Sequence, residues 1–342
     1  MENRRYEGIG SAVSNAIANR FSRGGAPVPA PASRRIDGKV CLVTGANRGL
    51  GKAVAIDLAR RGGRVLMACR SGHPEAGEEV RRRSGSDAVE MRKVDLADLA
   101  SVHALCDRLD HDRTRVDILV LNAGLMPARA RRSAQGYDAM FAVHFLANRA
   151  LIDRFLADGV IRPSDRRGET PRIVFVASET HRSAEPIDFD DFGGFADYGL
   201  RDGLKHYASS KLHVCTYAQE LSRRLNPDGE VRVAVHSLCP GAVSSDLARE
   251  APWFLKPLLI PVIRLCFAAP AKAAAPVTHA CCSEEMGRRS GVYLHLMREK
   301  PPAPLATDEA AGARLWRESE ALLSRHPPPA SHESRNASGA PE

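Results

Sequence analysis

Three polar residues in the second half of the chain have the types and spacing that acid–base chemistry needs. Tyr207 and Lys211 belong to the run Tyr-Ala-Ser-Ser-Lys, and residues i and i+4 of a helix share a face, so their side chains point into one cleft. A tyrosine has a reference pKa near 10, and a neighbouring cation is expected to lower that pKa towards neutrality, where the phenol works as a general acid or base. Ser178 ends a short apolar run, where its hydroxyl either polarises a carbonyl or simply caps a strand end.

A glycine-rich turn lies far upstream of these residues. Residues 43–51 read VTGANRGLG, which spaces Gly45, Gly49 and Gly51 as Thr-Gly-x-x-x-Gly-x-Gly. Glycine permits a tight turn, lets a ligand approach the backbone, and exposes the amides of a helix N-terminus to a pyrophosphate. A strand-to-helix turn needs glycine for itself as well, so this pattern alone leaves both interpretations open.

Two arginines bear on the choice of cofactor. NAD-binding turns place an acidic residue at the end of the second strand to take the ribose 2′-hydroxyl. Here that strand ends in MACRS, with Arg70 and no carboxylate before Glu75. Arg48 and Arg70 are therefore expected to clamp a 2′-phosphate; the alternative is two surface arginines in an arginine-rich chain.

Two further strand ends carry polar or small residues. Asp95 follows the third apolar run, where it either accepts a hydrogen bond from an adenine amino group or caps a helix. Residues 121–124 read LNAG after the fourth run. Asn122 and the small residues beside it suit close packing over a cofactor, although loop chemistry alone also explains them.

The elements that must position these residues alternate along the chain. Short apolar, β-branched runs occupy residues 39–44, 64–69, 88–96, 116–122, 172–178, 231–238 and 291–296, and helical stretches separate them at 51–62, 99–110, 137–156 and 207–225. Strands that alternate with helices predict a doubly wound α/β fold, with a parallel sheet covered on both faces. Ligands of such sheets bind beyond the carboxyl ends of the strands.

Composition sets broad limits. The 342 residues are 44% hydrophobic and 26% charged, with a formal net charge of +8, and the basic residues are scattered without the aromatic interleaving of a nucleic-acid groove. The excess charge suits an anionic cofactor, an acidic membrane surface or a merely arginine-biased surface. No apolar run of about 18 residues occurs, so no spanning helix is expected and the cytoplasm is the default location. The eight cysteines include no C-x-x-C, which favours a reducing compartment and no metal site.

Taken together, the glycine-rich turn and the later Ser178, Tyr207 and Lys211 resemble the short-chain dehydrogenase/reductase family over residues 38 to about 325. The family's Thr-Gly-x-x-x-Gly-x-Gly matches residues 44–51, its Asn-Ala-Gly matches 122–124, and its Pro-Gly matches 240–241. The runs MACR, GYDAMFAVHFLA, IDFDDF and ARLWRESEALL are most similar to the retinol dehydrogenase and protochlorophyllide reductase branch.

The resemblance implies one NAD(P)-binding Rossmann domain over residues 36–325, a substrate lid at about 245–275, and an oxidoreductase of CH–OH groups. It implies that Lys211 binds the nicotinamide ribose, that Ser178 holds the substrate oxygen, and that Tyr207 exchanges a proton as hydride passes to or from the nicotinamide. In this branch the residues matching Arg48 and Arg70 go with NADP(H), which is expected in preference to NAD(H). The residues expected to contact the cofactor are Thr44, Gly45, Asn47, Arg48, Gly49, Leu50, Gly51, Arg70, Asp95, Leu96, Asn122, Ala123, Gly124, Tyr207, Lys211, Pro240 and Gly241.

His144 departs from the family's pattern. It stands where the family has a catalytic Asn that holds a water beside the lysine, and we include it among the catalytic candidates because histidine itself relays protons. Asn148, one turn later, either substitutes for that Asn or is a helix-surface amide. Ala177 stands where a second serine is common. An alternative function is a catalytically weak NADPH-binding sensor or scaffold; light-driven reduction of a tetrapyrrole rests on the branch wording alone.

The ends of the chain and the substrate side are less readable. Residues 1–35 predict a flexible extension, and residues 326–342 predict a disordered tail. Between 251 and 274, five large apolar residues suggest an apolar substrate, contact with a membrane surface, or packing on the protein's own core or a dimer partner: Trp253, Phe254, Leu258, Ile260 and Phe267. The expected partners are a small lipophilic alcohol or carbonyl substrate and no nucleic acid; a homodimer, a homotetramer and peripheral membrane contact stay open.

Overall fold

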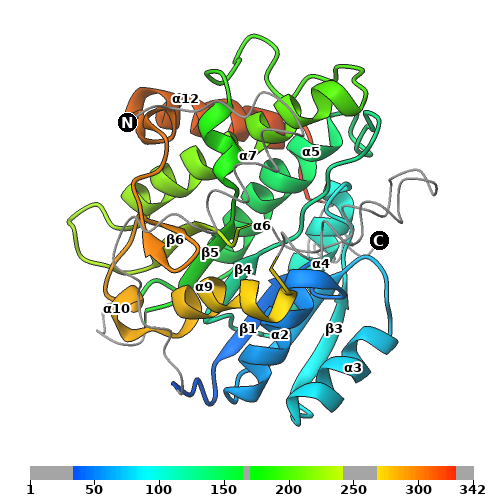
Figure 1. Cartoon of the computed structure of the whole chain (residues 1–342), viewed down its shortest axis with the longest axis vertical. Coiled ribbons are helices and arrows are strands. Elements are labelled where there is room, and N and C mark those ends of the chain that lie inside the picture. Colours follow the sequence, from blue (N-terminus) through cyan, green and yellow to red (C-terminus); the bar gives the residue numbers. More distant parts are fainter. Residues whose placement is uncertain (1–33, 165–169, 242–267, 329–342) are drawn as a thin grey trace, which may run out of the picture.

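An eight-stranded sheet forms the centre of the computed structural model, which describes residues 34–164, 170–241 and 268–328 (Figure 1). The strand order is β3-β2-β1-β4-β5-β6-β7-β8. The strands are β1 (Val40–Thr44), β2 (Arg64–Cys69), β3 (Val89–Lys93), β4 (Ile118–Leu121), β5 (Arg172–Val176), β6 (Ala234–Cys239), β7 (Val292–His295) and β8 (Arg298–Glu299). Strands β1 to β7 run parallel, and β8 pairs antiparallel with β7. The predicted doubly wound α/β fold is confirmed, and each of the predicted apolar runs contains a strand.

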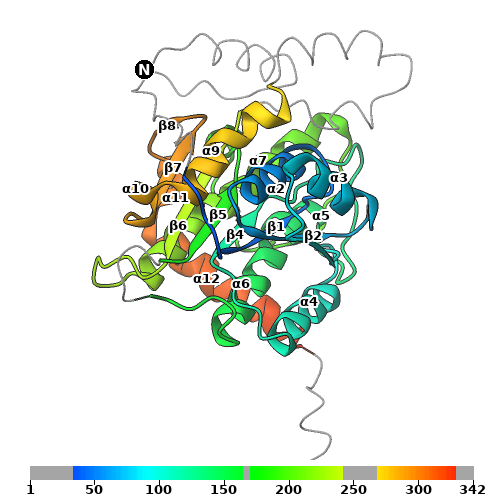
Figure 2. The same cartoon turned by 90° about the horizontal axis from the view of Figure 1, so that it is seen from below.

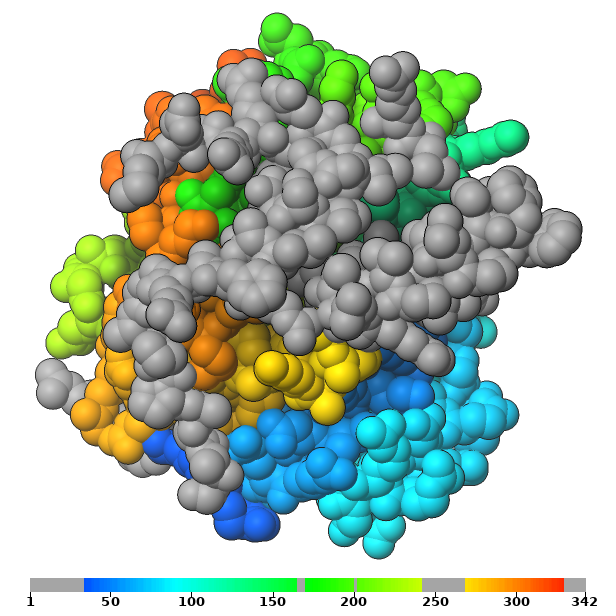
Figure 3. Space-filling view, viewed as in Figure 1, coloured from blue at the N-terminus to red at the C-terminus, as the bar shows by residue number. Residues whose placement is uncertain are grey.

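Helices cover both faces of the sheet. Figure 2 shows α2 (Gly49–Arg60), α3 (Glu75–Ser84) and α9 (Pro270–Cys282) on one side, and α4 (Leu99–His111), α6 (Ala147–Ala157) and α12 (Glu309–Ser324) on the other. The long helix α7 (Leu200–Leu225) packs on the second face with α12. On the first face α9 packs against α2, and their gold and blue surfaces adjoin in Figure 3. The shorter helices are α5 (Ala139–Phe141), α10 (Glu284–Gly287) and α11 (Pro304–Thr307).

The two faces of the sheet bury two separate cores. Successive side chains of a strand point to opposite faces, so Leu42 of β1 packs with α4 and α6, whereas Val43 packs with α2 and α9. Both side chains are completely buried. Burial on both faces explains why the central strands read as continuous apolar runs rather than as alternating ones.

The strand order reverses between β1 and β4. Strand β1 pairs with β2 on one side and with β4 on the other, so the connections that leave the carboxyl ends of β1 and β4 diverge and leave room between them. The turn at residues 44–51 and the segment at residues 122–124 follow these two strands, and both therefore lie at the same edge of the sheet.

The C-terminal helix fixes the position of α7. The Arg149 guanidinium lies over the indole ring of Trp316 on α12, 3.5 Å from the ring centroid. The Arg224 guanidinium lies 4.2 Å from the same centroid. Arg149 is only 2% exposed and forms an ion pair with Asp153 at 2.8 Å. Stacking of a buried guanidinium on indole is stabilising, so α12 holds α6 and α7 together at some distance from the site.

Two sequence predictions need amendment. The single helix predicted over 137–156 consists of α5, a π-helical turn η1 (Ala142–Leu146) and α6. Helix α3 was not predicted, because most of its residues are charged and only three of them are buried. Most of the predicted lid, the N-terminal extension and the tail lie outside the described residues. Within the described ranges, no helix is long and apolar enough to cross a membrane.

Candidate active site

The turn between β1 and α2 presents an open helix N-terminus. Arg48, the residue before α2, has an extended backbone (φ −159°) and no side-chain cap, and the first turn of the helix holds no acidic residue. Gly45 and Gly49 have φ values of +65° and +54°, which favour glycine. The first amides of α2 are therefore free of a side-chain cap and directed at the edge where a phosphate would lie.

The glycines also let this turn pack directly on the end of β4. A Cβ on Gly51 would lie 2.4 Å from the Gly45 carbonyl oxygen and 2.4 Å from the Asn122 side-chain nitrogen. A Cβ on Gly45 would lie 3.0 Å from the Cα of Ala123. The glycines thus bend the chain and let it pack directly on the β4 loop, while approach of a ligand to this turn stays a prediction.

The Thr44 hydroxyl joins the ends of β1 and β4. Its Oγ1 accepts hydrogen bonds from the backbone amides of Asn122 and Ala123, both at 3.0 Å. The Asn122 amide group returns a bond of 2.9 Å to the Thr44 carbonyl. Thr44 is completely buried, so this group of bonds holds the two segments that are predicted to bind the cofactor in one fixed arrangement.

The side of the site expected to hold the adenosine contains an ion pair. The Arg70 guanidinium lies 3.6 Å from the Asp95 carboxylate, and the Arg70 side chain is 69% exposed. Asp95 also accepts a bond from the Ala97 amide at 2.9 Å. The helix-capping alternative for Asp95 is wrong, because Asp98 is the residue that caps α4.

Ser178, Tyr207 and Lys211 meet beyond β5. The Tyr207 phenol is hydrogen-bonded to the Ser178 side chain, and the Ser178 Oγ also accepts from the Thr180 amide at 3.3 Å, capping the 3₁₀ helix η2 (Glu179–Ser183). The Lys211 Nζ donates to the Val176 carbonyl at 3.0 Å and lies 5.6 Å from the Tyr207 ring centroid. Ser178 is therefore both a cap and a partner of the phenol.

The protonation states differ from the expectation. Burial, together with the nearby Cys239 thiol, raises the pKa of Tyr207 to about 12, and the Ser178 hydrogen bond opposes this shift only in part. Burial also lowers the pKa of Lys211 to about 8. The expected lowering of the Tyr207 pKa by Lys211 is not found, because desolvation of the phenolate outweighs the attraction of an ammonium that is already bonded to a carbonyl.

His144 also lies beside Tyr207. It occupies the middle of the π-helical turn η1, is 1% exposed, and meets the Tyr207 ring edge-to-face with centroids 5.5 Å apart. Asn148 is buried, at 3% exposed, and its side chain donates to the His144 carbonyl at 2.7 Å. The interpretation of Asn148 as a helix-surface amide is therefore wrong.

The remaining predicted residues lie along the same edge of the sheet or just below it. The Asn47 amide lies 3.4 Å from the Ser71 hydroxyl, and Leu50 and Leu96 are core residues. Pro240 follows β6, and Gly241 has φ +82°, with Leu296 so close that a Cβ on Gly241 would lie 2.5 Å from it. Leu50 and Leu96 therefore contribute packing beneath the site.

Sequence reasoning missed the residues that hold the Ser178 loop. The His181 Nδ1 lies 2.6 Å from the Ser178 carbonyl, and the His181 Nε2 accepts from the Ala303 amide at 3.0 Å. Burial lowers the pKa of His181 to about 4, so the ring is neutral. Glu179 accepts from the Tyr293 hydroxyl at 2.8 Å and pairs with Lys300. No local motif marks these residues, because the partners that tie them to the rest of the fold, Tyr293, Lys300 and Ala303, lie more than one hundred positions away.

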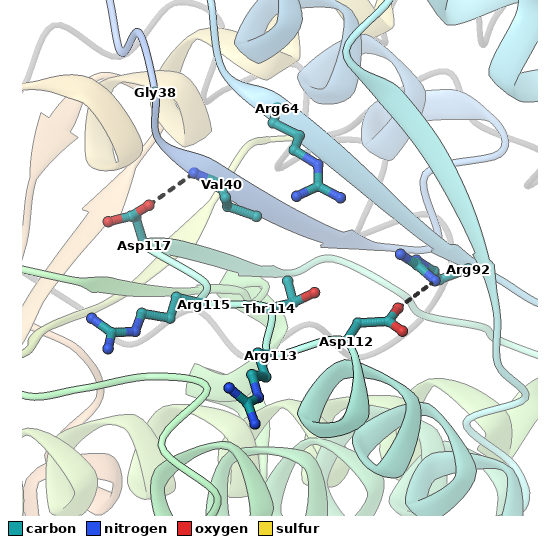
Figure 4. Close-up of a pocket in the computed structure, with 9 residues that line it drawn as sticks. All are labelled: Gly38, Val40, Arg64, Arg92, Asp112, Arg113, Thr114, Arg115 and Asp117. Atoms are coloured by element: carbon teal, nitrogen blue, oxygen red, sulfur yellow. Dashed lines mark hydrogen bonds and ion pairs between the residues drawn. The ribbon is translucent and has the colours of Figure 1, made fainter.

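A wide hollow of about 670 Å³ lies apart from this site. Figure 4 shows its lining at the start of β1 and β2, beside the α4–β4 connection: Gly38, Val40, Arg64, Arg92, Asp112, Arg113, Thr114, Arg115 and Asp117. Asp112 and Asp117 are already bound to Arg92 and to the Val40 amide. The lining contains none of the predicted site residues.

Comparisons with known proteins agree with this geometry. Residues 39–187 match the family described as short chain dehydrogenase. The chain is 35% identical to human retinol dehydrogenase 13, over 87% of this chain and 88% of that protein. It is 32% identical to human retinol dehydrogenase 14, over 89% and 90%. A crystal structure of an uncharacterised protein from Mycobacterium paratuberculosis superposes with a TM-score of 0.66 at 26% identity, covering 87% of this chain and 98% of that one.

The two hydrogen bonds that the Thr44 hydroxyl accepts from Asn122 and Ala123 can be tested by two substitutions. Thr44→Val leaves the two amides bound to Oγ1 without an acceptor, and each buried orphan donor costs about 1–3 kcal/mol. Thr44→Ser keeps the hydroxyl and loses one methyl, which costs about 1 kcal/mol. Urea unfolding should therefore find Thr44→Val the less stable variant by at least about 1 kcal/mol. Equal stabilities would show that the hydroxyl is not what joins the two strands.

Proposed function

The chain belongs to the short-chain dehydrogenase/reductase family and is an NAD(P)-dependent oxidoreductase of alcohol or carbonyl groups; we propose that it transfers hydride between NADP(H) and a lipophilic alcohol or carbonyl substrate, with Tyr207 as the general acid/base. The observation that carries this proposal is the meeting of Ser178, Tyr207 and Lys211 beyond β5, at the sheet edge that also holds the glycine-rich turn. A hydroxyl, a phenol and an ammonium around one point are the groups that proton exchange with a carbonyl oxygen requires.

The glycine-rich edge suits a dinucleotide. The uncapped N-terminus of α2 offers amides to a pyrophosphate, and the missing side chains of Gly45 and Gly51 let this turn pack directly on Asn122 and Ala123. A Cβ on Gly124 would lie 3.8 Å from the Lys211 Nζ, so the bare backbone there lies beside the ammonium of a residue that is only 4% exposed. A bound nicotinamide would supply or accept the hydride at this point.

The resting protonation states favour carbonyl reduction. With a pKa of about 12, the Tyr207 phenol keeps its proton at neutral pH and can donate it to a substrate oxygen. Ser178, hydrogen-bonded to the phenol, would hold that oxygen within reach of both hydroxyls. With a pKa of about 8, Lys211 is mostly charged at pH 7, which stabilises the negative charge that Tyr207 acquires when it gives up its proton.

The preference for NADP(H) rests on charge. Strand β2 ends without a carboxylate, and Arg70 lies directly after it with most of its side chain exposed. Arg48 precedes α2 on the neighbouring turn and is exposed too. A 2′-phosphate between two guanidiniums gains charge-assisted hydrogen bonds that a 2′-hydroxyl does not.

The lipophilic substrate class rests on two supports. The retinol dehydrogenases similar to this chain are named for an apolar alcohol, and Met126, two residues after Gly124, is an exposed large apolar side chain at 42%. The large apolar residues of the predicted lid lie outside the described part of the chain. The suggestion of peripheral membrane contact depends on the same residues.

Removing the phenolic hydroxyl tests the general acid. Tyr207→Phe should lower turnover by about 10²- to 10⁴-fold, the usual contribution of a positioned acid or base, and should leave the affinity for NADPH within about threefold. Tyr217→Phe is the matched control, because Tyr217 lies on the same helix but in the core, and it should keep turnover. Full turnover by Tyr207→Phe would refute the role of Tyr207. Tight NADPH binding without turnover in the wild-type protein would favour the sensor or scaffold alternative.

Removing Arg70 tests the cofactor preference. The lost charge-assisted bonds are worth about 1.5–3 kcal/mol, so Arg70→Ala should weaken NADPH binding at least tenfold and leave NADH binding nearly unchanged. Arg64→Ala is the control, since Arg64 begins the same strand at the opposite edge of the sheet and pairs with Glu90. Fluorescence titration measures both cofactors. Equal losses for NADPH and NADH would contradict the phosphate role.

A further inference from the structure

The hydrogen bonds of His144 fix where its proton lies. The His144 Nε2 is 2.9 Å from the backbone nitrogen of Leu125. A backbone amide can only donate, so Nε2 must present a lone pair. Burial, and next the charge of Lys211, lowers the pKa of His144 well below its usual value. The ring is therefore neutral at pH 7, and its one proton must sit on Nδ1.

The partner of that proton is Ser210. The His144 Nδ1 lies 2.8 Å from the Ser210 Oγ, and the same Oγ lies 2.8 Å from the Tyr207 carbonyl. A carbonyl can only accept, so the Ser210 hydroxyl donates to Tyr207 and accepts from His144. The bonds run in one direction, from the imidazole through the hydroxyl to the backbone of Tyr207. Ser210 is 3% exposed, so water does not readily replace it.

This chain of bonds connects two walls of the proposed site. Leu125 follows the Asn-Ala-Gly segment after β4, whereas Ser210 lies between Tyr207 and Lys211 on α7. A Cβ on Gly124 would lie 3.2 Å from the His144 Nε2, so the loop presses against the imidazole. The π-helical turn supplies an additional residue in this part of the helix, and its middle position is His144.

We propose that Ser210 and His144 are a pair of positioning residues that hold the β4 loop against the turn of α7 that carries Tyr207 and Lys211. Ser210 accepts the Nδ1 proton of His144, and the Nε2 lone pair accepts the Leu125 amide, so both bonds favour the same tautomer. The imidazole is an anchor and not a proton relay, because both ring nitrogens are bonded, and accepting a proton at Nε2 would break the bond to Leu125. The inference rests on the proposed function for its catalytic consequence, but not for its structural part.

The structural part is tested by NMR of the histidine rings in the full-length protein. Long-range proton–nitrogen correlation distinguishes the two neutral tautomers, and the spectrum of His144→Asn identifies the His144 signals among the 12 histidines. Wild-type His144 should carry its proton on Nδ1, and in Ser210→Ala the Nδ1–H signal should shift and exchange faster with solvent, because that proton loses its acceptor. A proton on Nε2 in the wild-type protein, or an Nδ1–H signal unchanged in both shift and exchange in Ser210→Ala, would overturn the proposal. This measurement needs no substrate, so it is independent of whether the protein reduces any carbonyl.

The catalytic part is tested by comparing two neighbouring serines. Misplacing a reacting group by about 1 Å costs up to about 10²-fold in rate, so Ser210→Ala should lower kcat at least tenfold. Its NADPH affinity should fall by a smaller factor than kcat, because neither Ser210 nor His144 is bonded to the start of α2 or to Arg70, where the phosphates are proposed to bind. Ser209→Ala, the same change on a partly exposed neighbour, should keep kcat within twofold, and Ser210→Thr should restore most of the lost rate. Equal kcat values for Ser210→Ala and Ser209→Ala would overturn the proposal, and so would failure of Ser210→Thr to exceed Ser210→Ala.

Discussion

The buried hydroxyl of Thr44 connects the two strands between which the sheet reverses its order. By accepting from the amides of Asn122 and Ala123, it fixes the end of β4 against the turn that begins α2. Parallel strands place their carboxyl ends at one edge, but only such bonds decide how closely two loops approach there. Gly51 depends on this contact, since its missing side chain is replaced by the Asn122 amide. The edge proposed to bind the cofactor is therefore one rigid unit, and Ser178, Tyr207 and Lys211 lie beside it, just after β5 and on α7.

Desolvation governs the chemistry at that edge more than pairwise charge does. It raises the pKa of Tyr207 and lowers that of Lys211, so at neutral pH the pair rests as a protonated phenol beside an ammonium. Such a pair is ready to give a proton rather than to take one. The same burial keeps His144 and His181 neutral, which lets each ring accept from one backbone amide while its other nitrogen bonds elsewhere. The histidines near the site thus hold loops in place without adding charge to it.

The sequence predicted the fold and the members of the site because these depend on local patterns. Apolar runs, glycine spacing and a Tyr-x-x-x-Lys pair on one helix face can all be recognised within a few residues. What it did not predict depends on tertiary packing. The partners of His144 are 19 and 66 residues away, and no spacing shows that its ring nitrogens are both occupied. The raised pKa of Tyr207 follows from burial by several elements, and helix α3 is composed mostly of charged residues and buries only three residues.

The central claim is hydride transfer from NADPH to a lipophilic carbonyl at this edge of the sheet. The most direct measurement incubates the full-length protein with NADPH deuterated at C4 of the nicotinamide and a panel of long-chain and cyclic aldehydes and ketones. Deuterium should appear on the carbinol carbon of at least one product, in proportion to the NADPH oxidised. NADPH that binds tightly but transfers no deuterium to any member of the panel would contradict the central claim.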